Sequence, residues 1–356
     1  WLATDSLKVK PLSTHESLFK DNNECNKKGP RLPDDPESIA FIQYSSGSTA
    51  KPKGIMISHG ALIHNLLTIR ALSFESEGHG SGVSVSWLPQ YHDYGLINFF
   101  LGSIYKPNFH SVCFSPLDFI RNPLLWADII ERYDATHTAG PNFAYGLLAK
   151  RMKAANRVFT NSKLFRANIA AEPIASQTLQ AMLDVGIPSG AINPTYGLAE
   201  SCVYVTSCLG DEVRILDGVV SCGLLSRNEA NHKHVVVADE KSKEIADDGV
   251  VGEIYIRGPD LASGYFGKPE LNNDQFRVRL SDGKEYFGTG DLGRIVDGYL
   301  YVVGRTKEVI IINGRNVYPI DLERTVESAF PNIIRPGSTA AFQFSDSEVG
   351  IVMEVR

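Results

Sequence analysis

Small hydroxyls, glycines and lysines gather in residues 44–54, which read YSSGSTAKPKG. Glycine lets a ligand approach the backbone closely, and successive N–H groups can then form a concave site for an anion. Hydroxyl groups and a lysine add hydrogen-bond donors and positive charge to such a site. The segment therefore predicts a loop that holds a polyphosphate.

This loop does not have the spacing of a Walker A motif. In that motif a Gly-Lys pair follows the first glycine after four residues, whereas Gly47 is followed at that point by Pro52 and Lys53. A solvated Ser/Gly linker is the alternative, but linkers are rarely framed closely by strands. Here residues 39–44 lead in and residues 55–57 lead out, and both apolar runs are typical of buried strands.

Another segment that could do chemistry is LPQYHDYG at residues 88–95, which follows an alternating strand pattern over residues 83–87. His92 stands beside Asp93, and ligands of α/β proteins bind beyond the carboxyl ends of strands. The alternative is a structural histidine that is satisfied by a hydrogen bond. On the residues alone both readings stay open.

Shorter motifs follow, and each is weak alone. Residues 170–173 (AAEP) could simply start a helix, and residues 196–200 (YGLAE) could be a helix N-terminus with an exposed glutamate. A flat aromatic such as Tyr196 could instead stack on a base, and a carboxylate could hold Mg²⁺ together with substrate phosphates. Residues 287–291 (FGTGD) and 304–308 (GRTKE) complete the set.

Taken together in this order, the motifs resemble those of the adenylate-forming (acyl-activating, AMP-binding) superfamily. The Pro-Gln-Tyr-His-Asp segment and Ser221-Cys222-Gly223 are most similar to fatty acyl-AMP ligases. The chain departs from that pattern at Tyr94, where methionine is usual, and at Ala170, where glycine is usual. The family extends further at both ends, and its C-terminal catalytic lysine has no match in this chain.

The resemblance implies a role for each matching position. Glu200 would hold Mg²⁺, Asp291 and Arg305 would hold the ribose, and His92 would lie near the carboxylate of the acid. The residues expected to be catalytic are Lys53, His92, Glu200 and Arg305. The residues expected to bind the nucleotide are Ser45, Ser46, Gly47, Ser48, Thr49 and Lys53 at the phosphates, Ala171, Glu172, Pro173, Tyr196 and Gly197 at the base, and Asp291 and Arg305.

The implied reaction is the activation of a fatty acid by ATP to an acyl-adenylate, with release of pyrophosphate. The acyl group would pass to a thiol of an acyl carrier protein or of a polyketide or nonribosomal peptide synthase carrier domain. An acyl-CoA ligase is one alternative. A catalytically weak module that binds lipid or nucleotide is another.

Strand and helix patterns alternate along most of the 356 residues, which predicts an α/β fold with mixed, largely parallel sheets. A large domain is expected over residues 1–303 and a hinge with the start of a small α+β subdomain over residues 304–356. An Asp-Gly pair at 297–298 predicts a tight hairpin that joins strands over residues 294–296 and 299–301.

Composition excludes several function classes. The net charge is −6 and no long basic run occurs, which argues against a nucleic-acid partner. No apolar run reaches the about 18 residues of a membrane span, so an integral membrane protein is not expected. The five cysteines are scattered without Cys-x-x-Cys spacing, which predicts reduced thiols in a cytoplasmic protein rather than zinc ligands or disulfides.

Overall fold

The computed structural model describes residues 35–45, 52–72, 81–105, 109–160, 163–210, 213–226, 232–312, 315–345 and 348–355. The predicted phosphate-binding residues Ser46, Gly47, Ser48 and Thr49 lie outside these ranges.

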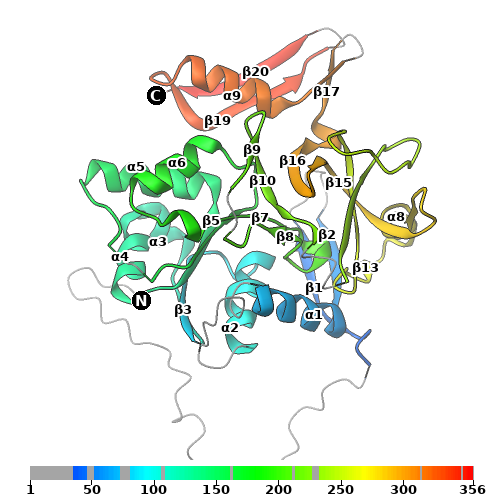
Figure 1. Ribbon diagram of the computed structural model, residues 1–356, viewed down its shortest axis with the longest axis horizontal. Coiled ribbons are helices and arrows are strands. Elements are labelled where there is room, and N and C mark those ends of the chain that lie inside the picture. The colour runs from blue at the N-terminus through cyan, green and yellow to red at the C-terminus, as the bar shows by residue number, and fades with distance from the viewer. Residues whose placement is uncertain are drawn as a thin grey trace, which may run out of the picture.

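A six-stranded sheet with the order β4-β3-β5-β6-β7-β8 forms the centre of the molecule (Figure 1). All neighbours in it are parallel except the last pair. The strands are β3 (Gly82–Ser86), β4 (Phe109–Cys113), β5 (His137–Pro141), β6 (Arg166–Ala170), β7 (Ile192–Tyr196) and β8 (Thr206–Ser207). The α/β class is thereby confirmed, and the parallel pairing belongs to this sheet.

Helices cover both faces of the central sheet. Trp126 and Tyr145 anchor the core on one face, and Ile97 with Ile57 anchors the core on the other. The first face carries α3 (Pro116–Arg121), α4 (Leu124–Arg132), α5 (Asn142–Ala154) and α6 (Ser176–Asp184), and the second carries α1 (His59–Arg70), η3 (Tyr94–Leu101) and α2 (Gly102–Tyr105). Within the described ranges, no helix is both long and apolar enough to cross a membrane.

Residues 94–105 form a helix that is not uniform. Its first part, η3, is a π-helix, and only Gly102–Tyr105 has α-helical bonding. Asp93 caps η3 by accepting from the N–H of Tyr94, so the helix begins directly after His92.

A small antiparallel sheet frames the predicted phosphate loop. It joins β1 (Ile39–Ser45), β2 (Lys53–Ser58) and β13 (Gly264–Tyr265). Ser45 pairs with Lys53, so the two strands bring both ends of the intervening loop together. Ser58 Oγ accepts from the N–H of Ala61 at 3.2 Å and caps α1.

A seven-stranded sheet beside the central one has antiparallel neighbours throughout. It contains β9 (Ile215–Leu216), β10 (Val219–Leu224), β11 (His234–Ala238), β12 (Gly252–Arg257), β14 (Val278–Arg279), β15 (Glu285–Val296) and β16 (Tyr299–Arg305), with α8 (Pro269–Phe276) beside β15. Asp297 and Gly298 have φ values of 51° and 78°, which fits the hairpin turn predicted between β15 and β16.

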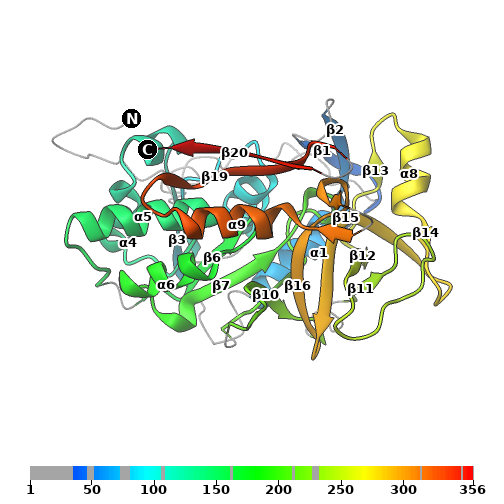
Figure 2. The ribbon, with the colours of Figure 1, turned by 90° about the horizontal axis from the view of Figure 1, so that it is seen from above.

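The last elements form a separate group along one edge, near α5, α6 and the β9–β10 turn (Figures 1 and 2). They are η6 (Thr306–Glu308), β17 (Ile310–Ile312), β18 (Arg315–Val317), α9 (Pro319–Ala329), β19 (Ile334–Gln343) and β20 (Val349–Val355). The domain division between residues 303 and 304 remains a prediction.

Candidate active site

Glu200, Tyr265 and Lys53 come together from three distant parts of the chain. Glu200 lies in the short 3₁₀-helix η5 (Ala199–Ser201), and Tyr265 in β13 pairs with Ile55 of β2, two residues after Lys53. Tyr265 Oη donates to Glu200 Oε1 at 2.8 Å, and Lys53 Nζ lies 4.6 Å from the centroid of the Tyr265 ring. The buried tyrosine thus separates and orients a carboxylate and an ammonium group.

Burial disfavours the charged form of both ionisable groups. It raises the pKa of Glu200, although the bond from Tyr265 and the nearby charge of Lys53 act in the other direction. Burial also lowers the pKa of Lys53, and the charge of Lys307 in η6 lowers it further, against the effect of Glu200. A bound cation near Glu200 and a bound polyphosphate near Lys53 would each compensate one of these penalties.

A second cluster joins Tyr196, Asp291 and Arg305. Tyr196 ends β7, and the β15–β16 pairing places Asp291 opposite Arg305. Tyr196 Oη donates to Asp291 Oδ2 at 2.7 Å, while Arg305 Nε lies 3.2 Å from Asp291 Oδ1. Burial raises the pKa of Asp291 even though both partners favour the carboxylate. The structure therefore brings together the two residues expected at the ribose, and adds the tyrosine expected at the base.

Polar contacts from β12 hold the stretch of β15 that carries Asp291. Gly290 has a φ of 72° and donates its N–H to Glu253 Oε1 at 3.0 Å. Thr289 Oγ1 donates to the carbonyl of Ile254 at 2.7 Å and accepts from the N–H of Asp291 at 3.0 Å. The two contacts of the Thr289 hydroxyl and the carboxylate of Glu253 thus hold the backbone at Gly290 and Asp291 in place.

The Ala171–Glu172–Pro173 segment leaves the carboxyl end of β6. Ala171 has a φ of 69°, a left-handed conformation, whereas Ala170 is the last residue of the strand. The replacement of the usual glycine at Ala170 therefore falls on extended backbone. Glu172 Oε1 accepts from the N–H of Phe143 at 2.5 Å, which ties the segment to the first turn of α5.

Gly197 is required by the packing of its own loop. A Cβ atom at this position would lie 1.8 Å from the carbonyl oxygen of Val203, so a larger residue would displace the backbone. Tyr196 before it is 8% exposed, and its hydroxyl is taken by Asp291. Contact of Tyr196 and Gly197 with a base stays a prediction.

His92 is placed by its own segment rather than by the two clusters above. Its side chain is 55% exposed, and Nδ1 lies 2.6 Å from Asp93 Oδ1, a hydrogen bond that raises the pKa of His92. Gln43 of β1 donates from Nε2 to the carbonyl of Tyr91 at 2.9 Å, which links this segment to the strand before the phosphate loop. Gly95 is needed because a Cβ there would lie 2.3 Å from the carbonyl oxygen of Pro89.

Sequence reasoning missed Tyr265 and Glu253. Neither residue belongs to a motif of the sequence analysis. No local signal distinguishes Tyr265, because its partner Glu200 lies 65 residues away in the chain. The signal for Glu253 is a buried carboxylate, 9% exposed, followed in the strand by the buried residues Ile254, Tyr255 and Ile256.

Comparison with known proteins gives this site a context. The sequence profile described as AMP-binding enzyme matches residues 3–266. The chain is 33% identical over 352 residues to a medium-chain-fatty-acid–[acyl-carrier-protein] ligase from Moorena producens, covering 89% of this chain and 58% of that protein. It is 34% identical over 354 residues to a long-chain-fatty-acid–AMP ligase from Mycolicibacterium smegmatis, covering 87% of this chain and 55% of that protein.

A solved structure supports the same relationship. The fatty acid AMP ligase from Legionella pneumophila aligns with a TM-score of 0.71 at 32% identity, over 90% of this chain and 59% of that one. The chain thus spans between one half and two thirds of the length of each of these relatives. The profile match covers most of the chain, and the chain belongs to the AMP-binding enzyme family.

Proposed function

We propose that the protein activates a fatty acid with ATP, forming an acyl-adenylate and pyrophosphate. The observation that carries the proposal is the convergence of two carboxylates, each held by a tyrosine, with a basic residue beside it. Tyr265 and Lys53 accompany Glu200, and Tyr196 and Arg305 accompany Asp291. The charge of Asp291 contributes to the raised pKa of Glu200, which supports treating the two groups as parts of one site.

In this proposal the nucleotide lies across both groups. The carboxylate of Asp291 accepts from ribose hydroxyls, with Arg305 beside it, while Lys53 and the residues 45–49 hold the phosphates. Glu200 would hold Mg²⁺, which commonly binds through one or two carboxylates plus substrate phosphates. A lone carboxylate suits this arrangement, and the described residues contain no group of three or more His, Cys, Asp or Glu side chains that could hold a metal without the substrate.

The protein's own residues would act mainly by positioning and by stabilising charge. When bound, Mg²⁺ would neutralise part of the phosphate charge. Lys53 would stabilise the negative charge that spreads over phosphate oxygens in the transition state. Its ammonium already lies over the Tyr265 ring, 4.6 Å from the ring centroid, which limits the reorganisation needed during reaction.

We place the acid near His92. The hydrogen bond to Asp93 raises the pKa of His92 and so increases the fraction of imidazolium near neutral pH. A half-exposed cation beside the strand that leads to the phosphate loop could attract the carboxylate of the incoming acid. His92 therefore acts in orienting the acid rather than in holding the nucleotide.

The proposed acceptor is the thiol of a carrier protein. A relative that is 33% identical is named for an acyl-carrier-protein acceptor, and the Legionella fatty acyl-adenylate ligase was solved with acyl adenylate and pyrophosphate. Transfer to coenzyme A is the second candidate, favoured by a 32% identical relative from Caulobacter vibrioides named as a putative acyl-CoA synthetase, which covers 90% of this chain.

Binding of a stable mimic tests the proposal directly. Calorimetry with dodecanoyl sulfamoyl adenosine and with AMP should show that the acyl compound binds at least about tenfold more tightly, because the acyl chain buries additional apolar surface. Equal affinities would contradict the fatty-acid assignment, and absence of any binding would contradict the nucleotide site. Acyl transfer from ATP and dodecanoate to a carrier-protein thiol or to coenzyme A then distinguishes the two acceptors.

A further inference from the structure

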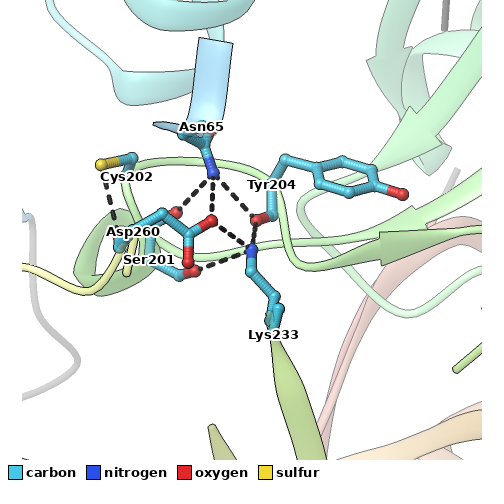
Figure 3. A network of polar contacts seen from close by, with 6 residues as sticks. All are labelled: Asn65, Ser201, Cys202, Tyr204, Lys233 and Asp260. Atoms are coloured by element: carbon cyan, nitrogen blue, oxygen red, sulfur yellow. Dashed lines mark hydrogen bonds and ion pairs between the residues drawn. The ribbon is translucent and has the colours of Figure 1, made fainter. Parts of the chain in front are cut away.

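A buried ion pair contacts Ser201, the residue that follows Glu200 (Figure 3). Lys233 Nζ lies 2.5 Å from Asp260 Oδ2, and the two side chains are 2% and 0% exposed. Asn65 of α1 joins the pair by donating from Nδ2 to Asp260 Oδ2 at 2.8 Å. Removing two charges from water is expensive, and a buried pair is weak evidence for stability by itself. What the three side chains hold in place is therefore informative.

Two of these side chains, and the backbone of the third residue, contact residues 201–204. Asn65 Nδ2 donates to the carbonyls of Ser201 and Tyr204, each at 3.2 Å. Lys233 Nζ donates to Ser201 Oγ at 3.2 Å and to the carbonyl of Tyr204. From the other side, Cys202 Sγ donates to the carbonyl of Asp260 at 3.3 Å. Ser201, Cys202 and Tyr204 are thus held by groups from α1, from the residue before β11 and from the segment after β12 (Figure 3).

The fixed backbone is strained. Cys202 has φ and ψ of 58° and −68°, and the N–H of Val203 donates to the carbonyl of Ser201 at 2.7 Å. This geometry is a γ-turn with a left-handed central residue, a rare conformation for a residue with a side chain. Such strain persists only where the surroundings over-determine it. The contacts from Asn65, Lys233 and Asp260 supply that constraint.

The γ-turn starts one residue after Glu200. The N–H of Ala262 donates to the Glu200 carbonyl at 2.8 Å, and Tyr265 holds the Glu200 carboxylate. Asp260, Ala262 and Tyr265 belong to one short segment. The segment that holds the γ-turn therefore also holds the carbonyl and the carboxylate of Glu200. A shift of the turn would rotate the carboxylate away from the Lys53 side.

We propose that Lys233, Asp260 and Asn65 are positioning residues that hold the γ-turn and thereby aim the Glu200 carboxylate at the metal-bound phosphates of ATP. The inference rests on the proposed function, because the role of Glu200 toward Mg²⁺ belongs to it. A purely structural network would affect folding but would leave the binding of magnesium and phosphate untouched in a folded variant. That difference defines the test.

The decisive variant replaces the whole pair, Lys233→Met with Asp260→Leu. Exchanging a buried pair for apolar residues of similar size is often neutral for stability, so this variant should fold. It keeps the contacts from Asn65 but lacks those from Lys233 to Ser201 Oγ and to the Tyr204 carbonyl. Calorimetry measures AMP binding without metal and ATP binding with and without Mg²⁺. The gain in ATP affinity caused by Mg²⁺ should fall about tenfold, the loss typical for removing support behind a metal ligand.

AMP binding serves as the internal reference. It depends on the Tyr196–Asp291–Arg305 cluster and should change by no more than about twofold, as for well-separated sites. Exchange of an exposed pair between α5 and α6, Lys153→Met with Asp184→Leu, should leave all affinities unchanged. An unchanged magnesium gain in the folded pair variant would overturn the positioning role.

A milder variant keeps the test valid if the pair variant does not fold. Ser201→Ala removes only the hydroxyl that accepts from Lys233, and should lower the magnesium gain by about threefold while AMP affinity stays constant. No change in this gain would then overturn the inference. A wild-type chain that binds ATP without any gain from Mg²⁺ would overturn it together with the metal role of Glu200. A chain that binds neither nucleotide would instead overturn the proposed function.

Discussion

The two carboxylates of the site are supported in opposite ways. The Glu200 side is held from behind by a buried pair whose members are 2% and 0% exposed. The Asp291 side is held by Arg305, which is 55% exposed and stands directly before η6 and the last group of elements. One support lies in the interior of the protein, whereas the other ends β16, directly before η6.

This difference separates what must stay fixed from what can move. A partner in a buried network cannot leave without stranding a charge, whereas an exposed ion pair is replaced by water at little cost. The charge of Lys307 in η6 lowers the pKa of Lys53, and the charge of Glu308 in η6 raises the pKa of Asp291. Movement of η6 would therefore change the electrostatics of the site. We infer that the Glu200 side of the site keeps one geometry, whereas the Arg305 side can move. Such movement is what closure of a loop or domain at a hinge requires.

The largest expected difference is in the free energy of unfolding when the cation of each support is removed in turn. Lys233→Met leaves Asp260 buried and unpaired, and should lower the free energy of unfolding by about 3–5 kcal/mol. Arg305→Met breaks an exposed pair and should lower it by no more than about 1 kcal/mol. Denaturant unfolding monitored by fluorescence measures both. Equal losses would contradict the proposed division, and recovery of stability in the Lys233→Met, Asp260→Leu double variant would confirm that the stranded charge is the cause.

The next effect concerns binding at the adjustable side. Asp291→Ala removes a charged acceptor from the proposed ribose contacts, which typically costs about 1.5–3 kcal/mol, or tenfold and more in AMP affinity. Arg305→Met should weaken AMP binding less, because the carboxylate and its bond from Tyr196 remain. Isothermal titration of both variants ranks them. Unchanged affinity in Asp291→Ala would remove the ribose assignment.

The sequence could predict these strands, the turn and the shared role of Asp291 and Arg305, because each is encoded by residues close together in the chain. The apolar runs around residues 44–54 became β1 and β2, and the Asp-Gly pair at 297–298 became the turn between β15 and β16. Asp291 and Arg305 were assigned to the same ligand, and the strand register places them opposite one another. In each of these cases nearby residues determine the geometry.

The supports of the site could not be predicted, since their contacts join distant segments. Asn65 and Asp260 are 195 positions apart, and Lys233 reads as an ordinary polar residue before a strand. The strain at Cys202 is equally invisible, because a cysteine gives no signal for a left-handed conformation. The motif Tyr196–Glu200 therefore identified the carboxylate but not the γ-turn that aims it.

The pH dependence of stability probes the fixed side with a smaller effect. Burial raises the pKa of Glu200 in the folded state, so the wild-type protein loses stability as the pH rises from the unfolded-state pKa through the folded-state pKa. Glu200→Gln removes this loss. The variant should be more stable than wild type at pH 7, and the difference should vanish at about pH 4, where the carboxyl is largely protonated in both states. A difference that is independent of pH would point to packing rather than ionisation.

The smallest effect is expected where α9 meets the large body. Arg324 donates from Nη1 to the carbonyl of Gly218 at 3.2 Å and from Nη2 to that of Ile174 at 3.1 Å. Burial lowers the pKa of Arg324, so these two carbonyls, one of them next to Pro173, hold a partly desolvated guanidinium. The contact tethers the last group of elements to the loop expected at the base.

Arg324→Met should free α9 without disturbing the site. Loss of about 1 kcal/mol of contact energy would speed amide hydrogen exchange in residues 319–329 about fivefold, while AMP affinity stays within about twofold. Arg151→Met, at an exposed arginine of α5, is the matched control and should leave exchange in α9 unchanged. If α9 exchanged at the wild-type rate in Arg324→Met, the joint would be held by other contacts. If AMP affinity fell in parallel, the two sides of the site would be coupled more tightly than their different burial implies.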